Sequence, residues 1–177
     1  MSTPFFGLMA EFEDHEILLH AARRAREEGY RNMDAFSPFP VEGLDQALGL
    51  PRSRIPLIVL LAGICGAGGG YFMEWYAMAK DYPLNIGGRP LNSWPAFIPI
   101  AFELTVLCAA LTAMISMLAF NRLPCPYHPV FNVPEFARAS LDRFFLCVER
   151  TDPLFDPAAT RKFLESLGPC KVMEVAE

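Results

Sequence analysis

Charged side chains are nearly missing from the middle of this sequence. Between residues 55 and 120 there are five, and these are Glu74, Lys80, Asp81, Arg89 and Glu103. In their place stand two long apolar runs, Ile55–Met73 and Trp94–Phe120. Each run is long enough to cross a bilayer, because about 20 helical residues span the roughly 30 Å hydrocarbon layer. In a helix, every backbone polar group finds its partner within the segment. The sequence therefore predicts a transmembrane hairpin over residues 55–120, with an outer loop at residues 80–94.

The sequence also lacks an excess of basic residues and any paired cysteine motif. Its net charge is −5, which leaves no basic surface for nucleic acid and excludes that class of partner. The five cysteines are scattered, with no C-x-x-C or C-x-x-C-H spacing. Neither an iron–sulfur cluster nor a c-type haem is therefore expected in this chain. No metal site is expected either, since Cys125 and His128 would supply only two ligands.

A cleavable signal sequence is a further feature that we do not find. Residues 1–14 contain no basic stretch followed by an apolar one. Arg52, Arg54 and Arg122 flank the two apolar runs, against two basic residues in the loop, which is a weak positive-inside bias. We therefore expect a two-pass membrane protein with both termini in the cytoplasm.

The N-terminal flank has the pattern of a strand, a helix and a second strand. Apolar residues alternate over Phe6–Phe12, which predicts a half-buried strand. Asp14 is suited to cap the following helix, and Gly29 to end it. The buried stripe of that helix is expected to hold Ile17, Leu18, Ala21, Ala22 and Ala25. A second strand is expected at residues 30–37.

The C-terminal flank repeats this order. Residues 143–150 read RFFLCVER, an apolar centre with charged ends that predicts a strand. Asp156 is a favourable N-cap for a helix with Pro157 at its first position. Gly168 is expected to end that helix. Its buried stripe would hold Phe163, Leu164 and Leu167. Residues 171–176 are expected to form the last strand.

Neither flank is large enough to bury a good core by itself. Two βαβ units together, however, can form one sheet with helices on one side. We therefore expect an α+β membrane protein, in which a two-helix transmembrane hairpin is inserted between the βαβ halves of a ferredoxin-like cytoplasmic domain. The halves would be residues 1–54 and 142–177. Residues 121–141 contain four prolines within eleven positions and are expected to be an extended tether.

Small residues mark one face of each apolar run. Gly66 and Gly70 form a G-x-x-x-G pair, which lets another helix approach closely. The second run carries a weakly polar face of Thr105, Ala109, Thr112, Ala113 and Ser116. Either these two faces pack on each other, or at least one docks onto another membrane subunit. Gly66 and Gly70 are therefore candidates for contact with a partner.

Glu74 and Glu103 are the acidic residues in or beside the apolar runs. A carboxylate there is costly unless it is paired, hydrated or protonated. The functional interpretation is that one of them handles protons or contacts a quinol. The alternative is a structural hydrogen bond to a partner helix or, for Glu74, exposure to lipid headgroups.

The most specific part of the sequence is residues 82–102, YPLNIGGRPLNSWPAFIPIAF. Gly87 and Gly88 permit positive φ angles and a tight turn. Prolines stiffen the return into the second run, and Arg89 is placed to meet carboxylate or carbonyl groups of a neighbour. A loop that only connects two helices does not need such rigidity, so we expect it to dock. The candidate contact residues are Asn85, Gly87, Gly88, Arg89, Pro90, Trp94 and Pro95.

This loop, NIGGRPLNSWPAFIP running into FELTVL, closely resembles the small two-span subunit (ActD type) of bacterial alternative complex III, a respiratory quinol oxidoreductase. The segments DRFFL, DPLFD and FLESLG extend the resemblance over nearly the whole chain. The resemblance implies partners of three kinds: integral membrane quinol-oxidising subunits, periplasmic multihaem and iron–sulfur subunits, and lipid. It also implies a place in the bacterial inner membrane. The c-type haems and iron–sulfur clusters would be carried by those subunits, with no cofactor in this chain.

The preferred hypothesis is a non-catalytic structural subunit that braces the larger membrane subunits and caps the cytoplasmic face. A first alternative is a direct contribution of Glu103 to quinol oxidation or proton transfer. A second is a free-standing, membrane-anchored ferredoxin-like sensor that binds a small ligand or metal.

Overall fold

The computed structural model describes residues 5–177, which form two compact units. The sheet unit joins the N-terminal flank, through Pro51, to the C-terminal segment Pro126–Glu177. The hairpin unit is Arg52–Cys125. Residues 1–4, the start of the segment inspected for a signal sequence, lie outside the described residues.

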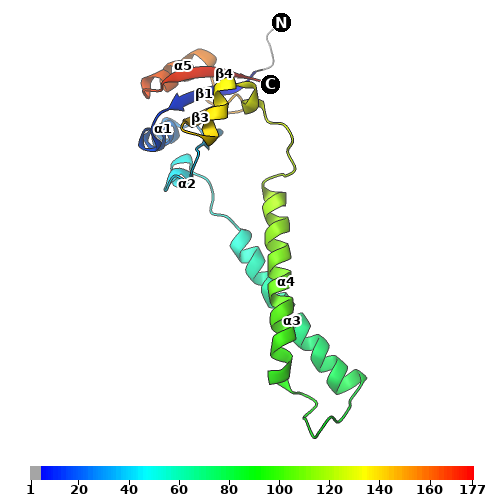
Figure 1. Ribbon diagram of the computed structural model, residues 1–177. Coiled ribbons are helices and arrows are strands. Elements are labelled where there is room, and N and C mark those ends of the chain that lie inside the picture. The colour runs from blue at the N-terminus through cyan, green and yellow to red at the C-terminus, as the bar shows by residue number, and fades with distance from the viewer. Residues whose placement is uncertain (1–4) are drawn as a thin grey trace. The chain divides into compact units, whose positions relative to one another are not determined.

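The sheet unit contains a four-stranded antiparallel sheet built from both flanks (Figure 1). Its strands are β1 (Phe5–Phe12), β2 (Met33–Phe36), β3 (Phe144–Glu149) and β4 (Lys171–Ala176). They lie in the order β2-β3-β1-β4, so β1 pairs on both sides with strands of the other flank. Met9 of β1, for example, lies opposite Cys147 on one side and Met173 on the other. The expectation that the two flanks share one sheet is confirmed.

Two capped helices accompany the sheet, as the sequence predicts. In α1 (His15–Glu28), Asp14 accepts a hydrogen bond from the backbone N–H of Glu16, and Gly29 closes the helix at a φ of 113°. In α5 (Pro157–Ser166), Asp156 accepts hydrogen bonds from the first free N–H groups. The prediction that Ile17 belongs to the buried stripe of α1 is wrong. Ile17 is 41% exposed, because it lies at the edge of the buried face.

Helices α1 and α5 both contribute to the core on one face of the sheet. The main buried side chains of this core are Leu8, Ala10, Phe12, Leu18, Ala21, Ala22, Ala25, Leu146, Val148 and Leu164. A short helix that the sequence analysis missed, α2 (Leu44–Leu48), adds Ala47 and Leu48 to it. Five residues are too few to show a helical period, so the sequence pattern does not predict this helix.

The proline-rich segment covers the opposite face of the sheet. The expectation that residues 121–141 form an extended tether is therefore wrong for the part from Pro129 to Ser140. Two 3₁₀ turns, η2 (Pro129–Asn132) and η3 (Pro134–Ser140), each begin with a proline. They bury Val130, Val133, Phe136 and Ala139 against Met9, Phe145, Cys147, Met173 and Val175. The central strand β1 is consequently buried on both faces over most of its length, not half-buried as its alternation predicts. Proline is compatible with the first position of such turns, because the N–H it lacks would be unpaired there.

Asp152 ties the two flanks together at the end of β3. Its carboxylate is buried and accepts hydrogen bonds from the backbone N–H groups of Arg31 (2.6 Å) and Asn32 (2.7 Å) in the N-terminal flank. A third bond comes from the N–H of Leu154, at 2.8 Å. Burial raises the pKa of the Asp152 carboxyl, but the three N–H groups outweigh burial and hold this pKa below its usual value.

The hairpin unit consists of two long helices that cross each other (Figure 1). The first is α3 (Ile55–Tyr76), which continues through one π-helical turn, η1 (Ala77–Asp81). The second is α4 (Trp94–Phe120), with Pro95 in its first turn. Both are long and apolar enough to cross a membrane. The connecting loop is Tyr82–Ser93, shorter than the expected 80–94, because the helix continues through Lys80 and Asp81 and the next one begins at Trp94.

Candidate functional site

Three glycines of α3 form the contact with α4. A Cβ on Gly66 would lie 2.5 Å from the carbonyl oxygen of Leu104, and one on Gly70 would lie 3.0 Å from Cα of Ala101. Gly63 is also buried there, 3.6 Å from Thr105 Cγ2 on the same measure. The two G-x-x-x-G residues thus meet the small face of α4 within this chain. We call this contact the seam.

The polar side chains along the seam bond to their own helix. Thr105 Oγ1 donates to the carbonyl oxygen of Ala101 at 2.6 Å, and Ser116 Oγ donates to that of Ala113 at 3.2 Å. Both hydroxyl groups are therefore satisfied without a second helix. The two helices of the seam are held by close packing of small residues, not by hydrogen bonds between them. Thr105 and Ser116 offer no free donor to a partner.

The loop end of the hairpin is shaped by a tight turn at residues 85–89. Asn85 Oδ1 accepts a hydrogen bond from the N–H of Gly88 at 3.1 Å. The N–H of Arg89 donates to the carbonyl oxygen of Ile86, also at 3.1 Å. Gly87 and Gly88 have φ angles of 59° and 76°, a region that L side chains rarely adopt. The turn explains why glycine is needed at both positions, and it directs Arg89 back toward the end of α3.

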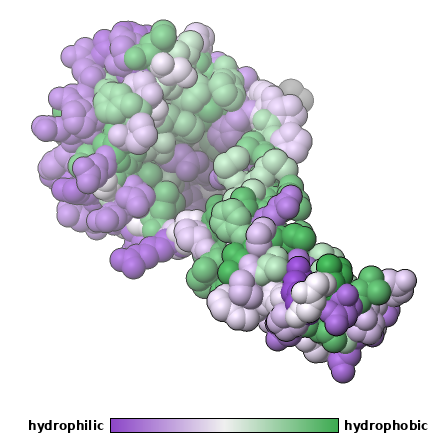
Figure 2. Space-filling view, turned by 60° about the horizontal axis from the view of Figure 1, so that its bottom comes forward, coloured by the Kyte–Doolittle hydropathy of each residue, from purple (hydrophilic) through white to green (hydrophobic). Residues whose placement is uncertain are grey.

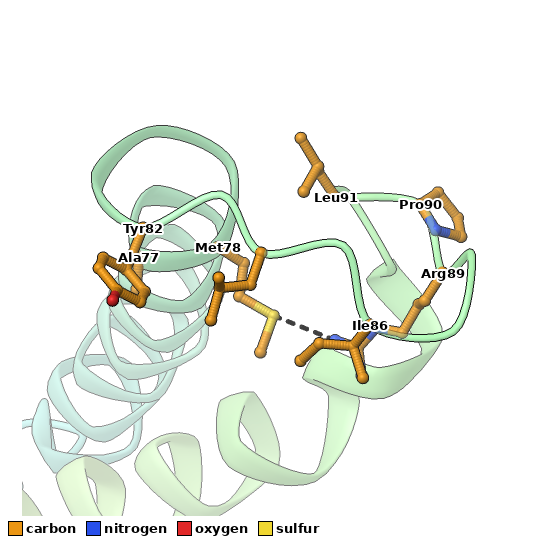
Figure 3. A pocket seen from close by; sticks show the side chains of 8 residues that line it. Ala77, Met78, Tyr82, Ile86, Arg89, Pro90 and Leu91 are labelled. Carbon is orange, nitrogen blue, oxygen red and sulfur yellow. Dashed lines mark hydrogen bonds between the residues drawn. The ribbon is translucent and has the colours of Figure 1, made fainter.

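An apolar pocket lies between this turn and the π-helical end of α3 (Figure 3). It has a volume of about 230 Å³ and is lined by Ala77, Met78, Tyr82, Leu84, Ile86, Arg89, Pro90 and Leu91. The side chains of Met78, Ile86 and Arg89 point toward one another there (Figure 3). Nη2 of Arg89 donates to the thioether sulfur of Met78 at 3.1 Å. We call this site the Arg89 pocket.

The Arg89 pocket combines apolar walls with one cation. A thioether is a weak acceptor, and a guanidinium carries five N–H donors, so Arg89 retains donors for a carboxylate or phosphate. Pockets that enclose cofactors or drug-sized ligands are usually 300–1,000 Å³. A volume of about 230 Å³ is suited instead to one or two apolar side chains with an adjacent anionic group.

The candidate loop residues divide into three groups in the structure. Arg89 and Pro90 line the pocket, while Asn85, Gly87 and Gly88 build the turn beside it. Trp94 and Pro95 lie outside the pocket lining, in the exposed first turn of α4, where the Trp94 side chain is 60% exposed. Sequence reasoning missed the apolar half of the pocket, Ala77, Met78, Tyr82, Leu84, Ile86 and Leu91. Met78 enters the pocket through the π-helical turn, which no sequence period indicated.

The two acidic candidates lie in different environments. Glu74 follows Gly66 and Gly70 at intervals of four residues, on the row that forms the seam, and is half-buried. Its Oε2 is buried without a hydrogen-bond partner among the described residues. Glu103 is exposed on α4. The structure therefore does not bring them together as a pair, and within residues 5–177 no three His, Cys, Asp or Glu side chains gather as metal ligands do.

A protein-family model for the ActD subunit of alternative complex III matches residues 6–174. The chain belongs to this family. The match begins in β1 and ends in β4, so it includes the hairpin, the loop end and both flanks of the sheet. No curated protein matches the chain. Membership in the ActD family makes the chain a subunit of alternative complex III, and the two apolar helices agree with a place in a membrane complex.

Proposed function

We propose that this chain is a non-catalytic structural subunit of alternative complex III. It would affect quinol oxidation only by helping the complex to assemble. The observation that carries the proposal is the match to the ActD family over residues 6–174. The contacts that the structure offers are suited to holding other subunits: a helical hairpin with exposed apolar sides, and a rigid loop with one cationic pocket.

The hairpin would brace the larger, quinol-oxidising membrane subunits. Of the 27 described residues of α4, only Phe97 and Ser116 are buried, so most of this helix remains available to lipid or to other helices. Figure 2 shows hydrophobic side chains along the hairpin, and hydrophilic side chains among hydrophobic ones at its loop end. This distribution supports a two-pass arrangement in the bacterial inner membrane.

The loop end would contact a periplasmic multihaem or iron–sulfur subunit. The rigid turn and the Arg89 pocket support this part of the proposal, since a charged apolar pocket suits an acidic side chain that is flanked by apolar ones. The c-type haems and clusters would belong to those partner subunits. The absence of C-x-x-C and C-x-x-C-H from the sequence supports an ActD chain without a cofactor of its own.

The sheet unit would be a ferredoxin-like domain that caps the cytoplasmic face, with both termini on that side. The strand order β2-β3-β1-β4 and the placement of α1 and α5 over one face support this assignment. The hairpin lies in the chain between β2 and β3, which is the midpoint of the βαβ repeat. Insertion at that point would leave both halves free to pair on one side of the membrane.

Arg89→Glu tests the proposal in the intact complex. Reversing this charge should weaken assembly, seen as less complete complex on native gels, while the quinol oxidation rate of each complex that does assemble stays unchanged. Lys80→Glu is the matched control, because it reverses a charge at the same end of the hairpin outside the pocket lining. A fully assembled but slow Arg89→Glu complex would contradict a purely structural role.

One observation favours a second candidate, in which Glu103 takes part in proton transfer or quinol oxidation. Glu103 is exposed on α4, so a neighbouring subunit could supply the rest of such a site. Glu103→Gln removes the titrating group and keeps a similar shape. Normal assembly with lost quinol oxidation or proton pumping would support this candidate over the structural role.

A further inference from the structure

Glu103 is the only Asp, Glu, Lys or Arg in the sequence of α4. It begins no turn and caps no helix end, since nine residues of α4 precede it and seventeen follow it. At 1.5 Å per residue, Glu103 lies roughly 13 Å from the start of a helix about 40 Å long. A hydrocarbon layer of roughly 30 Å centred on this helix would therefore include it. A glutamate side chain is too short to reach the nearer surface from that depth.

Glu103 faces away from the seam. With 3.6 residues per turn, it points roughly 100° to 160° away from Leu104, Ala101 and Cys108, which meet the glycines of α3. Its neighbours on the same side lie three or four residues along the helix, and these are the exposed apolar residues Ile100, Val106 and Leu107. We call the surface formed by Ile100, Glu103, Val106 and Leu107 the Glu103 face.

The hairpin itself supplies no partner for this carboxylate. No hydrogen bond or ion pair joins Glu103 to another of the described residues, 5–177. The seam occupies the other side of α4, so α3 cannot reach it without a different packing. A charged side chain at such a depth in lipid is disfavoured by roughly a hundredfold or more. The energetic deficit is removed if the group that covers the Glu103 face brings a positive charge.

The geometry points to a docking site for a membrane-spanning helix of another alternative complex III subunit, one that carries a basic side chain opposite Glu103. This inference rests on the proposed structural role and adds the face and the chemistry of the contact. Charge complementarity selects the occupant, because lipid tails offer neither a cation nor a donor. Ile100, Val106 and Leu107 would pack around the ion pair and exclude water from it.

Glu103→Leu separates docking from exposure to lipid. In lipid, leucine is more favourable than glutamate, so a lipid-facing position would keep or improve the retention of the chain. At the proposed contact, the same change strands the partner's cation without a counter-charge. We therefore expect the dilution midpoint at which the chain dissociates from the purified complex to shift at least tenfold toward higher concentration. Asp81→Leu is the control, because it removes a carboxylate at the exposed end of η1 and should leave the midpoint unchanged.

A photo-reactive residue at position 106 gives a second measurement that does not depend on charge. It should cross-link to a membrane subunit of the complex, whereas the same probe at Thr112, on the seam side of α4, should link mainly within the chain. Unchanged retention of Glu103→Leu, or a probe at 106 that links only to lipid, would overturn the inference. So would full retention of Glu103→Leu with lost quinol oxidation, which assigns the carboxylate to chemistry. If the unaltered chain itself fails to co-purify with the complex, the proposed function fails as well.

Discussion

The sheet unit and the hairpin unit differ in where their apolar side chains go. In the sheet unit, two helices cover one face of the sheet and the proline-rich turns cover the other, so β1 is buried from both sides. In the hairpin unit, the buried contact is the narrow glycine seam, and large side chains such as Leu60, Phe102 and Ile115 are exposed. The sheet unit thus supplies its own core, whereas the hairpin leaves most of its apolar surface exposed.

This difference separates two kinds of mutational effect. Changes inside the sheet unit should act on the stability of that unit, whatever surrounds it. Changes in the hairpin should act on the packing of α3 against α4 or on contacts with other chains. Many of these changes should leave the two helices themselves folded. Each unit also has its own reporter: both tryptophans, Trp75 and Trp94, lie in the hairpin, and the buried thiol of Cys147 lies in the sheet.

Gly7→Val should have the largest effect and should damage only the sheet unit. A Cβ on Gly7 would lie 2.3 Å from the carbonyl oxygen of Val148 and 3.1 Å from Cα of Glu149, and these backbone atoms of β3 leave little room for adjustment. The β1–β3 pairing would have to separate locally, at an expected cost of about 3–4 kcal/mol of unfolding free energy.

Cys147 provides the measurement. Burial raises the pKa of this thiol to about 12, so it should react slowly with thiol reagents until the sheet opens. Pulse labelling along a denaturant series, with mass spectrometry of the Cys147 peptide, should show the transition at lower denaturant in Gly7→Val. The fluorescence of Trp75 and Trp94 should stay unchanged at the same denaturant concentrations. Simultaneous loss of both signals would mean that the two units do not unfold separately.

Local signals explain how much of this fold is predictable. Asp14, Gly29, Asp156 and Pro157 mark helix ends through their own backbone chemistry, and the structure places those ends as predicted. The cover of the second face has no such signal. Val130, Val133 and Phe136 recur at every third residue, which is the period of a 3₁₀ helix and not of an α-helix or a strand. Only their contact with the sheet, which is distant in sequence, makes them core.

The site was predictable to a similar extent. The glycines of the turn and of the seam can be read from the sequence, because their conformational freedom and small size are properties of the residue itself. The contact between Arg89 and Met78 depends on the π-helical turn at the end of α3, which brings Met78 toward the loop. Such a turn is rare and leaves no sequence period, so the apolar half of the pocket could not be predicted.

Asp152→Asn should have the next largest effect, because it weakens the link between the two flanks of the sheet unit. An amide can keep the bonds to Arg31 and Asn32, but its NH₂ group would then face the N–H of Leu154, at an expected cost of about 2–3 kcal/mol. Asp142→Asn is the matched control, since the Asp142 carboxylate also binds an N–H donor, from Arg138, but is exposed.

The pH dependence gives this prediction a sign. The folded-state pKa of Asp152 is lowered, so its contribution is complete above the unfolded-state pKa of about 3.9 and is lost as pH falls through the lowered folded value. The difference in unfolding free energy between the unaltered chain and Asp152→Asn should be constant near neutral pH and shrink below about pH 4. Pulse labelling of Cys147 along a denaturant series at each pH measures it, with a pyridyl disulfide as the reagent because this reagent still reacts with thiols in acid. A difference that grows toward acid would show that Asp152 is destabilising as an anion.

Gly66→Val should have the smallest of these effects and should be confined to the hairpin. Its Cβ would lie 2.5 Å from the carbonyl oxygen of Leu104 and 3.0 Å from Cβ of Cys108, so α3 and α4 must move apart and lose seam contacts. We expect a cost of about 2 kcal/mol, since helices in a membrane can shift with little change in solvation. Gly68→Val is a close control, because a Cβ at Gly68 meets nothing within 4 Å.

In mixed micelles with increasing SDS, the fluorescence of Trp75 and Trp94 should change at a lower SDS fraction for Gly66→Val than for Gly68→Val, while Cys147 labelling stays the same. Equal midpoints for the two variants would mean that the seam does not hold the hairpin together, and that the surrounding subunits set the distance between its helices.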